Sequence, residues 1–331
     1  MHVQPTTQLI EADAAGVARA AQVLAAGGLV AFPTETVYGL GADAENGAAV
    51  ARLFEAKGRP RFNPLIAHVP DLAAARALAR FNNASERLAA AFWPGPLTLV
   101  LPKRADCPVA ELATAGLDTI AVRVPSHPIA RDILLACARA VVAPSANRSG
   151  HVSPTTAKHV LADLRGRIEL ILDGGPAPMG LESTIVACLE QPGLLRLGAL
   201  PRAQIERVVA LMPITAIESS AVDGEQVPLA PGQLASHYAP RTRLRLDARR
   251  VIAGEALLAF GPTQVQGAEH AVRVLNLSAR GDLIEAAANL FSHLRALDAC
   301  GAATIAVMPV PHTGLGEAIN DRLKRAAAPR G

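Results

Sequence analysis

Residues 29–41 read LVAFPTETVYGLG, and the way this stretch divides predicts the class of the fold. Its first four residues, 29–32, form an apolar run typical of a short buried strand, and Pro33 closes it. Hydroxyl groups, one carboxylate and two glycines follow at residues 34–41, which suits a loop that a ligand approaches closely. A turn that caps the next helix would have the same composition.

Short β-like runs alternate with helical stretches on both sides of this segment. Helices are predicted at 14–26 and 46–57, from 71 and from 85, and near 127 and 154. Strands are predicted at 65–69, 97–101, 119–124, 141–143, 168–172, 183–188 and 194–197. Strands mixed with helices at these spacings predict an α/β or α+β domain built on a mixed sheet.

The pattern breaks at residues 213–240, which contain four prolines and no sustained period, as expected for a linker. Strands are then predicted near 244 and at 256–260, 272–275 and 304–308, with helices at 282–299 and 316–327. We therefore expect three parts: a larger domain at 1–212, a linker at 213–240 and a small α/β domain at 241–331.

Composition excludes several classes of protein. Half of the 331 residues are hydrophobic, which is enough for a sizeable core, and a net charge of +3 does not require a nucleic-acid partner. The four cysteines form no C-x-x-C pair, so neither a zinc finger nor a disulfide framework is indicated. No signal-peptide pattern or membrane-length apolar run is visible, and we expect a cytoplasmic protein without a membrane partner.

The familiar nucleotide-binding motifs are missing from the sequence. There is no G-x-x-x-x-G-K-[ST] loop, and the G-L-G at 39–41 lacks a third glycine because Ala44 stands at that position. The H-E-x-x-H and G-x-S-x-G motifs are absent too. A P-loop ATPase and a Rossmann dehydrogenase are therefore not supported.

Polar clusters instead follow the ends of predicted elements. Lys57, Arg59 and Arg61 end a helix and could clamp phosphates, although cations also complement a helix C-terminus. A lone histidine at a strand end, such as His68, is more often structural. Arg123 shares a strand face with Thr119 and needs a partner, either an internal carboxylate or a substrate carboxylate.

Two further clusters complete the set. Residues 143–155, APSANRSGHVSPT, place small hydroxyl and amide groups before a helix, where they could bind a phosphate or simply cap the helix. Residues 182–185, ESTI, follow a Gly/Pro-rich loop, and Arg196 lies in the last strand. Together the clusters indicate a polar ligand site rich in anion-binding groups.

The strings FPTETVYGLG, KGRPRFNPLIAHV, WPGPLT, TIAVRVP, APSAN and ESTI occur in this order within residues 10–210. This part of the chain resembles the YrdC-like domain of threonylcarbamoyl-AMP synthases. The tail, with APGQLASHYAP and GLGEAINDRLKRAA, resembles the extension of the long form. The resemblance implies a mixed twisted sheet with a concave basic cleft, and a small Rossmann-like second domain.

The resemblance also implies a reaction. Threonine, bicarbonate or CO2 and ATP, with Mg²⁺ accompanying the nucleotide, give threonylcarbamoyl-AMP and pyrophosphate, and a downstream transferase uses the product to modify tRNA next to the anticodon. Lys57 and Arg59 would neutralise the phosphates as the catalytic residues. Threonine contacts would come from Thr36, His68, Arg123, Ser183 and the backbone of Ala143. ATP contacts would come from Lys57, Arg59, Asn63, Thr119, Ser145, Asn147, Ser153, Arg196 and Tyr238. No protein side chain is assigned to the metal.

Two alternatives use the same features. A double-stranded RNA-binding module would also present a basic concave surface, but residues 1–239 carry 20 Lys/Arg against 21 Asp/Glu. A carbamoyl-transfer domain of a larger maturation protein would be accompanied by zinc-binding modules. The tail, with 12 basic and eight acidic residues at 240–331, could contact tRNA or the transferase, although a solvated surface is favoured. We expect the tail to pack near the cleft, with the linker acting as a lid through Tyr238.

Overall fold

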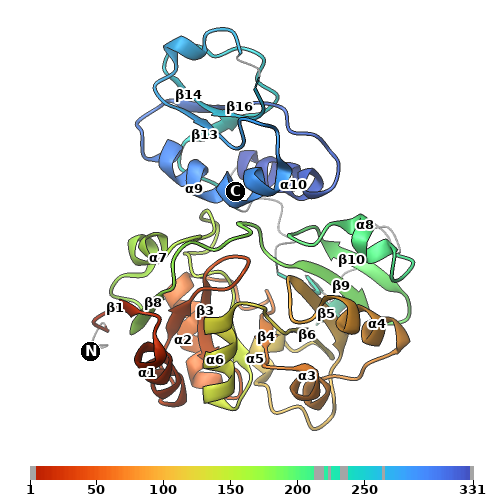
Figure 1. Ribbon diagram of the computed structural model, residues 1–331. Coiled ribbons are helices and arrows are strands. Elements are labelled where there is room, and N and C mark those ends of the chain that lie inside the picture. Colours follow the sequence, from red (N-terminus) through yellow and green to blue (C-terminus); the bar gives the residue numbers. More distant parts are fainter. Residues whose placement is uncertain (1–4, 212–219, 223–224, 232–237, 263–264, 329–331) are drawn as a thin grey trace.

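The computed structural model describes residues 5–211, 220–222, 225–231, 238–262 and 265–328. Figure 1 shows a larger domain that contains the N-terminus and a smaller domain stacked on it. No helix in the described ranges has the length and apolarity needed to cross a bilayer.

The larger domain is built on one ten-stranded sheet with the order β1-β8-β2-β3-β7-β4-β6-β5-β9-β10. Its strands are β1 (Gln8–Glu11), β2 (Val30–Phe32), β3 (Gly39–Asp43), β4 (Ile66–His68), β5 (Leu97–Pro102), β6 (Thr119–Arg123), β7 (Val141–Val142), β8 (Leu170–Asp173), β9 (Thr184–Cys188) and β10 (Pro192–Arg196). Parallel pairs such as β4–β6 alternate with antiparallel pairs such as β5–β6. The predicted mixed sheet is confirmed.

Helices pack against this sheet because each has one apolar face. They are α1 (Ala14–Ala25), α2 (Gly47–Lys57), α3 (Leu72–Leu78), α4 (Asn83–Phe92), α5 (Glu111–Thr114), α6 (Pro128–Cys137), α7 (Ala157–Leu164) and α8 (Arg202–Glu206). Side-chain caps define several starts: the Asp13 carboxylate accepts from the Gly16 N–H, and the Asn46 amide oxygen accepts from the N–H groups of Ala48 and Ala49. Gly58 ends α2 in the left-handed conformation at φ +60°.

The expectation that residues 34–41 form a loop is correct only for the first part of that stretch. Gly39–Asp43 is the buried strand β3, which pairs antiparallel with β2 and places Val30 opposite Gly41. A Cβ atom at Gly41 would lie only 2.8 Å from the ring of Phe32. Glycine is therefore required here by close packing between strands and not by a turn.

The smaller domain has a four-stranded parallel sheet with the order β13-β16-β14-β15. Its strands are β13 (Arg243–Arg245), β14 (Glu255–Ala259), β15 (Val274–Asn276) and β16 (Thr304–Val307), with a 3₁₀ turn at Ala268–His270. The long helices α9 (Leu283–Asp298) and α10 (Leu315–Ala327) lie on the side of this sheet that faces the larger domain (Figure 1). The second α/β domain is confirmed.

We expect an irregular linker between the domains, but part of this segment forms regular structure. Two short strands, β11 (Ser220–Val222) and β12 (Glu225–Val227), pair antiparallel as a hairpin. Three-residue strands are too short to produce a periodic pattern, which is why the sequence did not indicate them. Residues 232–237 of the string APGQLASHYAP lie outside the described residues.

The two domains share one apolar cluster. Val37, Val152 and Leu181 of the larger domain belong to the same buried cluster as Leu290 and Ile319 of α9 and α10. At its edge the Tyr238 ring stacks on Phe291, with ring centres 5.6 Å apart. Ion pairs flank this contact: Arg295 of α9 lies 3.0 Å from Asp163, and Arg202 lies 3.0 Å from Glu317 of α10. The tail therefore packs directly on the larger domain.

Because of this close packing, we predict that Gly180→Ala lowers the stability of the protein. Gly180 has φ +67°, and an added Cβ would lie 2.3 Å from the carbonyl oxygen of Ala287 on α9. Backbone strain and overlap together should lower the free energy of unfolding by roughly 2–4 kcal/mol. Gly281→Ala is the matched control, because Gly281 has φ +77° but nothing within 4 Å of the added Cβ. Urea unfolding followed by circular dichroism should show a smaller loss there, about 1 kcal/mol; equal losses would contradict the packing argument.

Candidate functional site

A polar cavity opens where strand ends of the larger domain meet the interdomain segment, with an empty volume of about 480 Å³ that is partly open to solvent. Its lining consists of Thr36, Val37, Arg59, Ile66, His68, Arg123, Ala143, Pro144, Ser145, Glu182, Ser183, Arg196, Pro231 and Tyr238. All five residues predicted to contact threonine are in this set. Of the predicted ATP contacts, Arg59, Ser145, Arg196 and Tyr238 also line the cavity, whereas Lys57, Asn63, Thr119, Asn147 and Ser153 do not.

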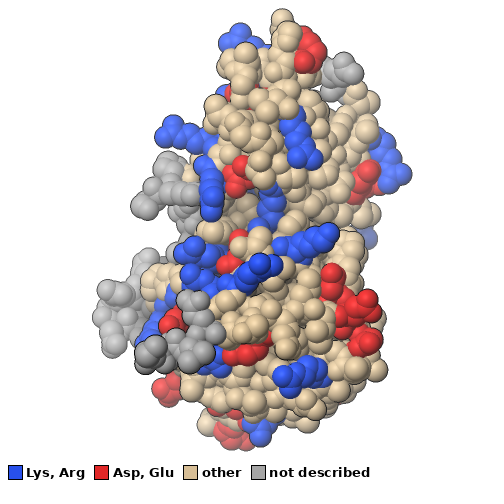
Figure 2. All heavy atoms as spheres, turned by 90° about the vertical axis from the view of Figure 1, so that its left-hand side faces the viewer, with Lys and Arg blue, Asp and Glu red and all other residues tan. Residues whose placement is uncertain are grey.

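Sheet register explains why distant residues meet here. In the parallel pair of β4 and β6, His68 stands opposite Arg123, so both carboxyl ends present a polar side chain at the same edge. Ala143 follows the neighbouring strand β7, and its N–H donates to the Ile66 carbonyl over 3.1 Å. Thr36 lies in the connection from β2 to β3, while Ser183 precedes β9. Figure 2 shows Lys and Arg side chains gathered along the junction of the domains on the face that it displays.

Arg123 has an internal partner in this structure. Its Nη2 donates to Glu35 Oε1 over 2.6 Å, and the two side chains are only 5% and 6% exposed. Burial alone would raise the pKa of Glu35, but the charge and hydrogen bond of Arg123 bring it below the ordinary value. Of the two partners that the sequence left open for Arg123, the structure contains the internal carboxylate. Nη1 has no hydrogen-bond partner among the described residues, which leaves a donor for a second anion.

His68 is uncharged at neutral pH. Burial, followed by the nearby charge of Arg123, lowers the pKa of His68 to about 3. Its Nδ1 lies 3.1 Å from the Ile66 carbonyl oxygen, so Nδ1 carries the proton and donates to that oxygen. The other ring nitrogen, Nε2, is then a hydrogen-bond acceptor at the cavity wall.

The cavity also contains two buried arginines held by backbone oxygens. Arg59 donates from Nε to the carbonyl of Asn63 over 3.2 Å and from Nη2 to that of Pro64 over 3.0 Å. Arg196 donates from Nε and Nη2 to Ser183 O over 3.1 and 2.9 Å, and from Nη1 to Pro231 O over 3.2 Å. Carbonyls fix each guanidinium without cancelling its charge, so both remain electrostatically available to an anion.

Lys57 lies behind the cavity wall instead of in it. Its ammonium donates to the carbonyl oxygens of Ser145 and Asn147, each at 2.5 Å, and the residue is 2% exposed. Burial, with the neighbouring charge of Arg59, lowers its pKa well below the ordinary value. In this structure Lys57 therefore supports the loop at 145–147, and the expected direct phosphate contact stays a prediction.

Several other predicted ATP contacts carry polar atoms that lack a partner. Asn63 Oδ1, Thr119 Oγ1 and Asn147 Oδ1 are buried without a hydrogen bond in the described structure. Buried polar atoms are nearly always satisfied in folded proteins, so each marks a place where a ligand or water is expected. Ser153, by contrast, is occupied: its hydroxyl donates to Glu182 Oε1 at 2.5 Å.

The sequence analysis assigned no role to three charged residues of this region. Glu35 and Glu182 stood within the recognised strings but received no role, and Arg322 of α10 was missed. A signal existed for Arg322, because it falls on the buried helical face that includes Ala318, Ile319 and Ala326. A fully buried arginine on an apolar stripe indicates an ion pair.

The side chains near the cavity include few groups that could bind the expected Mg²⁺. No group of three or more His, Cys, Asp or Glu side chains that could hold a metal exists in the part of the chain that is described. The two carboxylates near the cavity, Glu35 and Glu182, are each paired with an arginine. Mg²⁺ that accompanies ATP commonly takes most of its ligands from phosphate and water, and the expected Mg²⁺ stays a prediction.

The buried pair predicts a pH-dependent effect of Glu35→Gln on stability. Because folding lowers the pKa of Glu35 below 4.5, its carboxylate stabilises the fold above that pH, and the contribution is lost as the pH falls through the folded value. The variant should lose roughly 2–4 kcal/mol of unfolding free energy at pH 7. That difference should shrink below pH 4.5.

Urea unfolding at a series of pH values provides the measurement. Asp106→Asn is the control, because it removes a carboxylate from the solvent-exposed pair with Arg104 and should change little. A pH-independent loss in the Glu35 variant would mean that the charge of Glu35 is not what stabilises the fold.

Comparison with known proteins places the chain in a family. Residues 22–198 match the Sua5/YciO/YrdC family, described as "Telomere recombination", and residues 200–328 match "Threonylcarbamoyl-AMP synthase, C-terminal domain". The threonylcarbamoyl-AMP synthases of Pyrococcus abyssi and Bacillus subtilis are 43% and 39% identical to it, and the matches cover 94% and 95% of this chain and 94% and 93% of theirs.

A solved structure extends the agreement to three dimensions. The crystal structure of P. abyssi Sua5 complexed with L-threonine superposes with a TM-score of 0.83 at 38% identity, and covers 99% of this chain and 98% of that one. Both domains are therefore shared in order and in fold. The chain belongs to the threonylcarbamoyl-AMP synthase family, in the form that carries the C-terminal domain.

Proposed function

We propose that this protein is an L-threonylcarbamoyladenylate synthase, which converts L-threonine, bicarbonate or CO2 and ATP into threonylcarbamoyl-AMP and pyrophosphate. The observation that carries the proposal is the composition of the cavity. One wall brings together Arg123, neutral His68 and Ser183, and Arg59 and Arg196 supply buried positive charge in the same cavity. An amino acid and a polyphosphate require this combination.

The proposed first step is formation of the carbamate. Arg123 would use its spare Nη1 donor for the threonine carboxylate. The Nε2 lone pair of His68 would accept a hydrogen bond from the threonine amine or hydroxyl. The neutral amine nitrogen forms a bond to the carbon of CO2 and loses one proton to water, which gives an N-carboxylate. With bicarbonate as the carbon source, one water molecule leaves instead.

In the second step a carbamate oxygen attacks the α-phosphorus as the bond to the β-phosphate oxygen breaks and pyrophosphate leaves. This displacement needs alignment and neutralised charge more than covalent help. Arg59 and Arg196, both held by carbonyls, would supply fixed positive charge. Mg²⁺, arriving with ATP, would screen the phosphates further.

The product is a mixed anhydride, and therefore an activated acyl donor. A transferase that modifies tRNA next to the anticodon would consume it, in the cytoplasm where the tRNA is found.

The decisive experiment incubates the purified protein with ATP, Mg²⁺, bicarbonate and each amino acid in turn, and scores pyrophosphate together with the adenylate product. Threonine should support turnover above all other amino acids, and omission of bicarbonate should abolish it. RNA binding that falls steeply with salt, without any threonine-dependent pyrophosphate, would favour a double-stranded RNA-binding module instead.

Arg59→Ala should reduce threonine-dependent pyrophosphate release at least about 100-fold, because it removes a preorganised charge from the phosphate site. Circular dichroism should show that the variant remains folded. Arg61→Ala is the matched control, since Arg61 is two residues further along and exposed outside the cavity lining. Near-normal turnover of folded Arg59→Ala would refute the phosphate-clamp role.

We also infer that the segment at 213–240 completes the site as a lid. Pro231 and Tyr238, both from this segment, line the cavity, and Pro231 accepts a hydrogen bond from Arg196. Deleting residues 213–331 should therefore lower kcat/KM for ATP by about tenfold or more. Circular dichroism must first show that residues 1–212 still fold, because the deletion exposes Val152 and Leu181. A folded truncation with full activity would refute the lid.

A further inference from the structure

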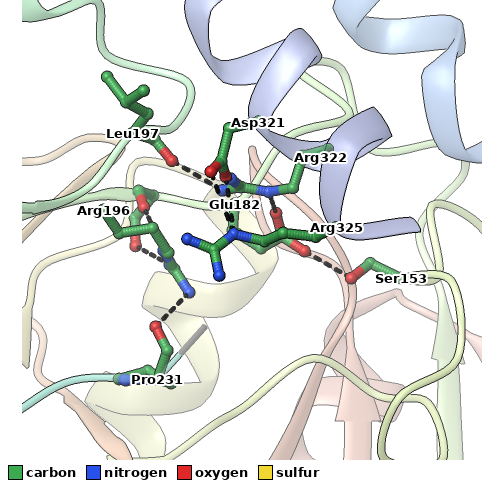
Figure 3. Close-up of polar contacts among 9 residues, drawn as sticks. Ser153, Glu182, Arg196, Leu197, Pro231, Asp321, Arg322 and Arg325 are labelled. Carbon is green, nitrogen blue, oxygen red and sulfur yellow. Dashed lines mark hydrogen bonds and ion pairs between the residues drawn. The ribbon is translucent and has the colours of Figure 1, made fainter. Parts of the chain in front are cut away.

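Arg322 of the second domain contacts Glu182, which lines the cavity of the larger domain (Figure 3). It is 0% exposed, and its Nε donates to Glu182 Oε2 over 2.9 Å, while Nη2 donates to the Leu197 carbonyl over 2.7 Å. Nη1 pairs with the adjacent Asp321 carboxylate. The guanidinium carbon also lies 5.0 Å from the centre of the Tyr238 ring. One side chain of α10 thus contacts both a strand end of the larger domain and the interdomain segment.

Glu182 is the acceptor that makes this contact relevant to the site, because it lines the cavity and is 6% exposed. Its other oxygen accepts from Ser153. Burial alone would raise its pKa, but the charges of Arg322 and Arg196 bring it below the ordinary value, so Glu182 is ionised. The cavity therefore contains a fixed negative charge beside the arginines that would receive a polyphosphate.

An unneutralised carboxylate at this position would oppose nucleotide binding in two ways. It would repel the phosphates directly, since two like charges a few ångströms apart interact strongly in a dry site. It would also compete for Arg196, whose charge already acts on Glu182. In the structure Arg196 instead donates to Ser183 O and Pro231 O, and Arg322 takes the carboxylate (Figure 3).

We propose that Arg322 is a positioning residue of the nucleotide site: it neutralises and holds Glu182, so that the charges of Arg196 and Arg59 remain available to ATP. The inference rests on the proposed function and adds a role for the second domain, which supplies one charge of the site from outside the larger domain. Asp321, in turn, stabilises Arg322 from its own helix.

Simple attachment of the domains would not require this arrangement. The domains already share an apolar cluster, and the Arg202–Glu317 ion pair joins α8 to α10 with side chains 41% and 28% exposed. Apolar residues would stabilise a buried contact at least as well as an ion pair does. A fully buried arginine aimed at a cavity carboxylate is better explained by the charge of the site.

The test measures ATP binding by calorimetry without threonine, in the full-length protein, for Arg322→Met, Glu182→Gln and the double variant. Arg322→Met should raise the Kd for ATP about tenfold or more, because it leaves Glu182 buried and unpaired. The double variant Glu182→Gln/Arg322→Met should recover most of that loss, because the offending charge is gone. Arg202→Gln, which breaks the partly exposed interdomain pair with Glu317, is the matched control and should bind ATP like the unaltered protein.

Recovery in the double variant distinguishes a charge effect from a structural one, since loss of domain packing would not be repaired by Glu182→Gln. An equally weak Kd in the single and double variants would overturn the proposal, and so would an unchanged Kd in Arg322→Met. Thermal unfolding shows whether each variant is folded. If Arg322→Met does not fold, Arg322→Gln, which also removes the positive charge, replaces it, and the same recovery is expected when it is combined with Glu182→Gln. If the unaltered protein binds ATP but releases no pyrophosphate, the proposed reaction is wrong. The role of Arg322 would still be decided by the Kd values for ATP of the variants.

Discussion

The need to pair buried charges governs this structure. Arg123 ends a strand inside a ten-stranded sheet, and its ion pair with Glu35 ties that strand to the connection between β2 and β3. Taking two charges out of water is costly, and only close geometry with further hydrogen bonds compensates. The connection that carries Glu35 also carries Thr36, so the pair that satisfies a buried guanidinium also brings a cavity residue to its place.

Burial also constrains the cations in and behind the cavity wall. Backbone carbonyls hold Arg59 and Arg196, which line the cavity, and this restricts their positions but leaves their charge uncancelled. Carbonyls hold Lys57 behind the wall in the same way. The result is a site with fixed positive charge and little room for reorganisation. Such preorganisation is what stabilisation of a phosphoryl-transfer transition state requires.

The second domain takes part in this arrangement through packing and charge together. Its apolar helices share a cluster with the larger domain, and Arg322 extends from one of them to Glu182. Tyr238 lies between Arg322 and Phe291 and also lines the cavity. Strand ends and the interdomain segment therefore line the cavity, and α10 supports it from behind through the contact of Arg322 with Glu182.

Much of this was determined by the sequence alone. Apolar runs predicted most helices and strands, since periodicity is a local property of the chain. Ordered polar strings at strand ends predicted most of the residues that line the cavity. Reasoning from the local sequence failed where contacts with distant residues determine the structure. Gly39–Asp43 looked like a loop because its glycines serve contact between strands, and β1, mostly exposed at a sheet edge, has no apolar pattern.

Only the tertiary structure decided which charges meet. Nothing in the local sequence around Arg123 selects Glu35 over a substrate carboxylate, and the two are 88 residues apart. Likewise Glu182 and Arg322 lie 140 residues apart, in different domains, and each is unexceptional by itself. The physical reason is that a hydrogen bond between side chains depends on distance and direction in space, whereas periodicity and capping act over a few residues along the chain. The sequence determined that charged residues would stand at buried strand ends and on an apolar helix face, and the folded chain determined their partners.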